Sequence, residues 1–333
     1  MNNNALIFDG HGDVWTDITC RSIDHGERDI FRKRHLAKFQ EGQVGGGIFV
    51  IWIDPPYDKD PVARAKQICK AVKQEKEDAK DIINIVRRFS DFEIGTKAGK
   101  INVVTGMEGL SEIGEDIDQL NYYYEEMDVR HAMLSWNETN TLATGWPGDK
   151  ERGLTAKGKE AVRRIHSLGM VMDVSHLNDK CFWDVIDLSD GHPIIASHSN
   201  SRAVCPHMRN LSDEMIKAIA ETGGLLGMNS MREFIAEDRA HQTVSHLADH
   251  IDHIVDLVGP DHVGLGFDFD DYLEADALSA FSGHIDSPSG DGIGSEREAK
   301  NIIAELAKRG YQEEDLNKIA YGNYYRVFRE VWK

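Results

Sequence analysis

The sequence has few cysteines, and their spacing suits neither a disulfide framework nor a thiolate metal site. Its 333 residues contain four, scattered along the chain without a CxxC pair: Cys20, Cys69, Cys181 and Cys205. Isolated thiols of this kind are typical of reduced, buried side chains. The cysteine content therefore argues against a small disulfide-stapled protein and against a zinc site built from cysteine.

The chain also lacks a basic stripe and a long hydrophobic run. Asp and Glu (57) outnumber Lys and Arg (38), which gives a formal net charge of −19 and disfavours binding to nucleic acid. No apolar run reaches the length of a membrane span, and the first residues, MNNNALIFDG, have neither the basic leader nor the apolar stretch of a signal peptide. We therefore expect a cytoplasmic protein that binds neither nucleic acid nor membranes.

Short apolar runs rich in β-forming residues recur eight times along the sequence. Segments with helical periodicity lie between them, for example at 155–168, 212–221 and 246–258, and another helical region follows from 295 onward. Thr155, Asn178 and Ser212 stand where helix N-caps are expected. The eight candidate strands are 5–8, 47–53, 101–105, 129–134, 170–174, 193–196, 224–228 and 262–266.

Eightfold alternation of strand and helix predicts an α/β protein with a parallel sheet covered by helices. Eight repeats favour a closed (β/α)₈ TIM barrel over an open doubly wound sheet, and no GxGxxG motif follows an early strand. No linker divides the chain. We expect a single barrel domain over residues 1–333, with a long loop at about 270–294.

Residues able to bind metals or carry protons follow five of the eight predicted strands. In a (β/α)₈ barrel, the loops after the strands form the active site. Histidines and carboxylates without cysteine suit Zn²⁺ or another divalent first-row metal. Taken singly, a histidine at a strand end is more often a hydrogen-bonded structural residue; the coincidence of the candidates is what favours a site. The six candidates are His11, Asp13, Glu108, His176, His198 and Asp268.

Their number exceeds the three protein ligands that a single catalytic zinc usually takes. Two ions resolve the count if His11 and Asp13 hold one, His176 and His198 hold the other, and Glu108 bridges them. Ions about 3.5–4 Å apart would lower the pKa of a water between them to about 7 and give a bridging hydroxide.

Asp268 then remains for proton transfer, with Asp270 of the same FDFD stretch as its rival. Asp9 and Asp173 precede metal-binding candidates and would either orient their imidazoles or bind backbone groups.

Six motifs in order, from Phe8 to about Glu330, together resemble the membrane dipeptidase (renal dipeptidase) family of zinc metallopeptidases, in its bacterial form. They are DGHGDVW, GMEG, MDVSH, PIIASHSNSRAVCPHMRNLSD, HVGLGFDFD and GYQEEDLNKIAYGNYYRVF. The resemblance implies a (β/α)₈ barrel, two Zn²⁺ per chain and hydrolysis of dipeptides, including those with a C-terminal D-residue. It assigns the five metal ligands and Asp268 the roles given above.

The resemblance further implies that Arg209 binds the free carboxylate of the substrate, with Arg202 as the competing arginine. Two positions depart from the animal members. Trp136 replaces a substrate-contacting histidine, and Met231 stands near the place of a carboxylate-binding tyrosine, so Arg209 would act alone or with Arg232. Members are often dimeric, which makes a homodimer an expectation here.

Two other functions remain open at this point. One is a different binuclear hydrolase of the amidohydrolase type, acting on lactones, β-lactams or phosphotriesters; the other is a barrel that binds without catalysing. The HxD motif in place of HxH, and the absence of a lysine after the fourth run, disfavour the first. The presence of all six site residues disfavours the second. We therefore expect a zinc dipeptidase.

Overall fold

Eight parallel strands close into a barrel in the computed structural model, which describes residues 7–279, 282–283 and 287–332. The sheet order is β2-β1-β9-β8-β7-β6-β5-β4, and β2 also pairs with β4, which closes the ring. The predicted TIM barrel is thereby confirmed. The strands are β1 (Ile7–Gly12), β2 (Val44–Trp52), β3 (Ile83–Ile85), β4 (Ile101–Glu108), β5 (Val129–Met133), β6 (Val171–Asp173), β7 (Ile194–Ala196), β8 (Leu225–Met228) and β9 (Val263–Leu265).

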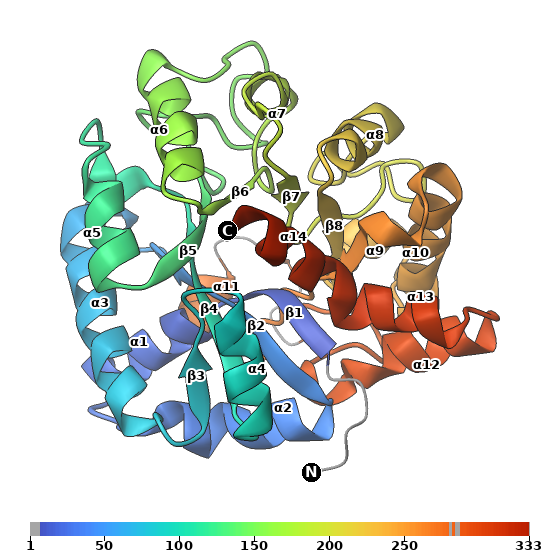
Figure 1. The fold of residues 1–333 in the computed structure, drawn as a ribbon, viewed down its shortest axis with the longest axis horizontal. Helices are drawn as coiled ribbons and strands as arrows, with labels where there is room; N and C mark the ends of the chain where they lie inside the picture. Colours follow the sequence, from blue (N-terminus) through green and yellow to red (C-terminus); the bar gives the residue numbers. More distant parts are fainter. Residues whose placement is uncertain (1–6, 280–281, 284–286, 333) are drawn as a thin grey trace.

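Helices surround the strands, and α14 crosses the barrel in the view of Figure 1. The described helices are α1 (Val14–Asp24), α2 (Leu36–Glu41), α3 (Pro61–Asp78), α4 (Ser90–Lys97), α5 (Gln119–Glu126), α6 (Ala156–Ser167), α7 (Asp179–Ile186), α8 (Asp213–Glu221), α9 (Arg232–Ile235), α10 (Val244–Val258), α11 (Ala275–Leu278), α12 (Lys300–Lys308), α13 (Glu313–Asn317) and α14 (Asn323–Val331). Within this part of the chain, no helix combines the length and apolarity that crossing a membrane requires.

Each predicted strand corresponds to one strand of the barrel, although positions 5 and 6 lie outside the described residues. The three predicted N-caps are confirmed, because Thr155, Asn178 and Ser212 each accept a hydrogen bond from the backbone N–H three residues later. Strand β3 is not predicted. It has only three residues and pairs with the start of β4, outside the ring.

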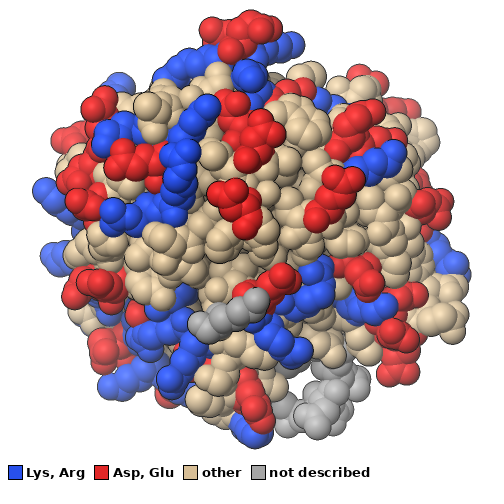
Figure 2. Space-filling model, turned by 45° about the horizontal axis from the view of Figure 1, so that its top comes forward, with Lys and Arg blue, Asp and Glu red and all other residues tan. Residues whose placement is uncertain are grey.

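The predicted loop at about 270–294 contains the short helix α11. Positions 280–281 and 284–286 of this loop lie outside the described residues. On the face seen in Figure 2, acidic and basic residues are interspersed, as expected for solvated helix surfaces.

Tyr324 of α14 fills the barrel from the end where the strands begin. Its side chain is fully buried, packs on Phe8 at the start of β1, and donates a hydrogen bond to the Ser197 carbonyl oxygen at 3.1 Å. A Cβ atom at Gly10 would lie 1.7 Å from the Tyr324 hydroxyl, and one at Gly227 would lie 2.5 Å from it. Gly10 is therefore needed for the close approach of the Tyr324 side chain. Side chains fill the barrel interior beneath the ends of the strands.

His250 of α10 anchors the long loop after β7 and does so as a neutral imidazole. Its Nε2 lies 2.9 Å from the Ile235 carbonyl oxygen, and its Nδ1 accepts the Ser201 N–H at 3.1 Å. These two bonds require the proton on Nε2 and the lone pair on Nδ1. Burial lowers the pKa of His250 to about 4.

We expect His250 to make the protein less stable in acid. Because its folded pKa lies below the unfolded value of about 6.5, the unfolded chain takes up the proton first, so stability falls as the pH drops from 6.5 toward 4. The loss from this residue is about 2 kcal/mol between pH 7 and pH 5. Urea unfolding at both pH values should show a smaller acid loss in His250→Gln than in the wild type. Equal losses would contradict the assignment.

Candidate active site

The six metal-binding and proton-transfer candidates lie together where the barrel strands end. His11 is in β1, Asp13 precedes α1 and Glu108 is the last residue of β4. His176, His198 and Asp268 follow β6, β7 and β9 by two or three residues. Five of the six are less than 9% exposed, and the Asp268 side chain is 13% exposed. A one-residue register shift between β1 and β2, at Asp9 to Gly12, marks a bulge next to the site.

Glu108 lies between two groups of site residues. Its Oε2 is 3.3 Å from His11 Nε2, whereas its Oε1 is 3.0 Å from His176 Nε2 and 3.7 Å from His198 Nε2. On the first side, His11 Nε2 lies 4.0 Å from Asp13 Oδ2 and 3.6 Å from Asp268 Oδ1. One carboxylate thus turns an oxygen toward each group.

The chemistry of this donor set fits divalent metal ions. Ligand atoms of His11, Glu108 and His198 lie within 4.8 Å of one another, and so do those of His11, Asp13 and Asp268. His176 Nε2 and His198 Nε2 are only 2.8 Å apart. Imidazole nitrogens and carboxylate oxygens that converge in this way are the ligands that Zn²⁺ and similar ions prefer.

The charges of the site respond strongly to burial and to each other. Burial alone would lower the pKa of His11, but Glu108, Asp268 and Asp13 outweigh it and raise that pKa to about 10.

On the other side of Glu108, burial lowers the pKa of His176 to about 4 and that of His198 well below its ordinary value, with Arg209 adding to both shifts. These two imidazoles are neutral at pH 7, the form that binds metals.

Three polar neighbours of the site were not singled out from the sequence. Asn137 Oδ1 lies 2.9 Å from His176 Nδ1, and Ser197 Oγ lies 2.8 Å from His198 Nδ1. Both contacts are satisfied when Nδ1 carries the proton, which leaves the Nε2 lone pairs directed at Glu108 and the shared centre. Asn229 Nδ2 donates to Asp268 Oδ2 at 3.1 Å. In the sequence, only their position next to a motif or a candidate residue could have indicated these three side chains.

Asp268 and its rival Asp270 have different surroundings. Asp268 approaches His11, and burial raises its pKa, with Glu108 contributing in the same direction. Asp270 is 1% exposed, and neither of its carboxylate oxygens has a hydrogen-bond partner among the described residues. Asp268 also adopts a left-handed backbone with φ of 59°, as does His176 with φ of 68°. Strained backbone of this kind is concentrated at functional sites.

Asp9 and Asp173 do not contact the imidazoles that they precede. Each uses its Oδ1 to accept backbone N–H groups, from His11 and Phe267 in one case and from Ser175 and Ser197 in the other. Of the two roles expected from the sequence, the structure supports backbone binding.

Arg209 is the arginine best placed to bind an anion. It is 3% exposed and donates one hydrogen bond, to Ser199 Oγ at 2.6 Å, while its Nε and Nη2 have no partner among the described residues. Burial lowers its pKa to about 10, so it keeps its charge at neutral pH. Arg202 instead pairs with Asp179. Arg232 is also committed, to Ser287, Gln242 and Asp291, so the expectation that it assists Arg209 is not supported.

A cavity of about 180 Å³ opens onto these groups and is lined by Asp13, Glu108, His176 and Asp268. Trp136 and Met231, the two other substrate-binding candidates from the sequence, also line it. The Trp136 ring lies 5.1 Å from that of Trp52 and 6.1 Å from that of His176. Trp146, His207 and Phe234 complete an aromatic wall, and the Arg209 guanidinium lies 5.8 Å from the Phe234 ring centre. The cavity suits a small ligand.

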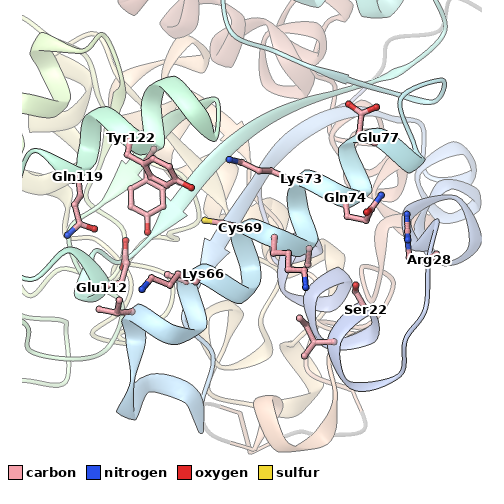
Figure 3. Close-up of a pocket in the computed structure, with 16 residues that line it drawn as sticks. Ser22, Arg28, Lys66, Cys69, Lys73, Gln74, Glu77, Glu112, Gln119 and Tyr122 are labelled. Atoms are coloured by element: carbon pink, nitrogen blue, oxygen red, sulfur yellow. The ribbon is translucent and has the colours of Figure 1, made fainter.

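A larger hollow of about 860 Å³ lies on the outside of the barrel, against α1, α3 and α5 (Figure 3). Lysines of α3, including Lys66 and Lys73, surround Cys69 there. Burial raises the pKa of the Cys69 thiol to about 11, so it is not a nucleophile at neutral pH. None of the predicted site residues lines this hollow.

The chain is similar in sequence and in fold to known proteins. The family model for membrane dipeptidases (peptidase family M19) matches residues 1–333. Dipeptidase tcpJ of Claviceps purpurea is 26% identical over 97% of this chain and 76% of its own length. An uncharacterized protein of Klebsiella pneumoniae, from the pqqA 5′ region, is 31% identical over 73% of this chain and 87% of its own.

A similar fold is found in a crystal structure of a metallopeptidase from Rhodobacter sphaeroides, liganded with a phosphinate mimic of the dipeptide L-Ala-D-Ala. It is 24% identical, covers 99% of this chain and 100% of its own, and has a TM-score of 0.85. At this identity the likeness concerns the fold.

Proposed function

The chain belongs to the membrane dipeptidase family, a family of metallopeptidases, and on that premise we propose that it hydrolyses dipeptides with two divalent ions, Zn²⁺ or another first-row metal. The observation that carries the two-ion proposal is the position of Glu108, with Oε2 toward His11 and Oε1 toward His176 and His198. A single ion would leave one side of this carboxylate unused. His11 and Asp13 would hold one ion, and His176 and His198 the other.

When bound, such a pair polarises the scissile carbonyl and lowers the pKa of the attacking water toward 7. The residues of the chain do the rest. Arg209 would take the C-terminal carboxylate of the substrate with Nε and Nη2, which have no hydrogen-bond partner in the described part of the chain. This recognition requires a free C-terminus and selects dipeptides over proteins. The cavity wall beside it, which includes Trp136 and Met231, would contact the substrate side chains.

Asp268, held by Asn229, would accept a proton from the water and pass it to the departing amine.

Metal removal tests the proposal directly. We expect two metal ions per chain by elemental analysis and a loss of dipeptide hydrolysis of at least about 10²-fold after chelation, restored by added Zn²⁺. His176→Ala should retain one ion, because the ligands on the other side of Glu108 remain. A wild-type protein that carries a single ion at saturation would overturn the two-ion proposal. A fully loaded protein that hydrolyses no dipeptide would overturn the dipeptidase proposal.

We further propose that dipeptides with a C-terminal D-residue are substrates, with L-Ala-D-Ala as the first to test against L-Ala-L-Ala. Hydrolysis of lactones, β-lactams and phosphotriesters is the alternative that the same assay should include. The homodimer and the cytoplasmic location expected from the sequence stay predictions.

A further inference from the structure

Asp173 joins two strands at the point where their backbone pairing ends. It is the last residue of β6 to pair with β7, opposite Ile195, and it is 0% exposed. Beyond that pair, Asp173 Oδ1 accepts the backbone N–H of Ser175, two residues after Asp173, at 2.8 Å. It also accepts the backbone N–H of Ser197, two residues after Ile195, at 3.1 Å. Each of these serines immediately precedes a metal-binding candidate.

Asp9 repeats the arrangement between β1 and β9. It pairs with Leu265 of β9 and is 5% exposed. Its Oδ1 accepts the N–H of His11, two residues on, at 3.3 Å, and the N–H of Phe267, two residues beyond Leu265, at 2.9 Å. Phe267 immediately precedes Asp268. The two aspartates therefore make the same pair of bonds in the same register.

We propose that Asp9 and Asp173 are positioning residues, each of which fixes one half of the metal centre by bridging the backbone of two adjacent strand ends. Asp173 sets the half that contains His176 and His198, and Asp9 sets the half that contains His11. The inference rests on the two-ion centre proposed above. It assigns one positioning aspartate to each half of that centre.

Asp173 is itself held in place by a histidine inside the barrel. Its Oδ2 lies 2.8 Å from Nε2 of His131, which is 0% exposed and projects from β5. Gly106 of β4 makes room for this ring, since a Cβ there would lie 2.6 Å from His131 Nδ1. His131 leaves Oδ1 free for the two N–H groups. Burial alone would raise the pKa of Asp173, but His131 and the N–H donors outweigh it and lower the pKa to about 2.

The test measures metal affinity rather than turnover, by competition of the metal-loaded protein with a chromophoric chelator. Asp173→Ala should weaken one ion about 10- to 100-fold and leave the other unchanged, and Asp9→Ala should do the converse. To identify which ion is affected, both variants are also made in the His176→Ala background, where the ion next to His11 remains. There Asp173→Ala should have no further effect, whereas Asp9→Ala should weaken the remaining ion.

Two controls separate positioning from general destabilisation. Asp54→Ala removes an equally buried aspartate, which binds Arg64 at 2.7 Å; it should lower the free energy of unfolding and leave both metal affinities unchanged. Asp173→Asn keeps an acceptor oxygen and should keep both ions, and it decides the matter if Asp173→Ala does not fold. The proposal fails if Asp173→Asn loses an ion, or if Asp173→Ala weakens both ions equally or neither. A wild type that binds fewer than two ions refutes the two-ion centre instead.

Discussion

Asp268→Asn is expected to lower kcat for dipeptide hydrolysis by about 10²- to 10⁴-fold, the usual contribution of a group that transfers a proton in the transition state. The amide has nearly the same shape as the carboxylate, so metal content should stay at the wild-type value. The measurement combines steady-state kinetics on L-Ala-D-Ala with elemental analysis of the same preparation.

The matched variant for this experiment is Asp270→Asn, two residues away in the same FDFD stretch. Asp270 has no hydrogen bond to a metal-binding candidate, and its loss should cost much less in kcat than the loss of Asp268. If Asp270→Asn abolishes turnover while Asp268→Asn remains active, the proton-transfer role belongs to Asp270. If Asp268→Asn loses metal, its carboxylate acts as a ligand, as its 3.6 Å approach to His11 also permits.

Arg209→Met is expected to reduce kcat/KM for dipeptides by about 10²- to 10³-fold, because the substrate carboxylate would enter a buried site without its counter-charge. A dipeptide amide has no carboxylate to lose, so its kcat/KM should change little. The quantity to measure is the ratio of kcat/KM for the dipeptide to that for its amide, which should fall toward unity in the variant.

Arg202→Met provides the control, since Arg202 lies in the same loop but is paired with Asp179. In Arg202→Met, the ratio of kcat/KM for the dipeptide to that for its amide should equal the wild-type ratio. A ratio that is unchanged in Arg209→Met and collapsed in Arg202→Met would reverse the assignment made from the sequence. Unchanged ratios in both variants would mean that the carboxylate is recognised by another group.

The barrel and the location of its site were predictable because both depend on short-range pattern. Eight apolar runs are enough to count the strands, and polar residues that follow parallel strands must meet at one end of the barrel. Strand β3 was not predicted because its sequence, INI, is too short to be distinguished from the ends of the neighbouring helices. Ser197 was not predicted because a hydroxyl next to a histidine is too common to be informative. Asn137 was not predicted because it lies 39 residues before His176, the histidine that it contacts.

The bridging aspartates show a different limit of sequence reasoning. Asp9 and Asp173 are visible in the motifs, but their function depends on the register between two strands that lie far apart in the chain. Phe267 is brought to Asp9 by the closure of the barrel, across more than 250 residues. No local pattern contains that register, and the sequence alone left an imidazole contact and a backbone contact equally open.

The tyrosine that fills the barrel also links the last described helix to the first strand. Tyr324 follows Gly10, which it contacts, by more than 300 residues, and it follows all nine described strands in the chain. The Ser197 carbonyl oxygen, one residue before His198, therefore accepts a hydrogen bond from a helix that follows all the described strands in the sequence. A chain shortened before α14 would lack this contact beneath the strand end that carries His198.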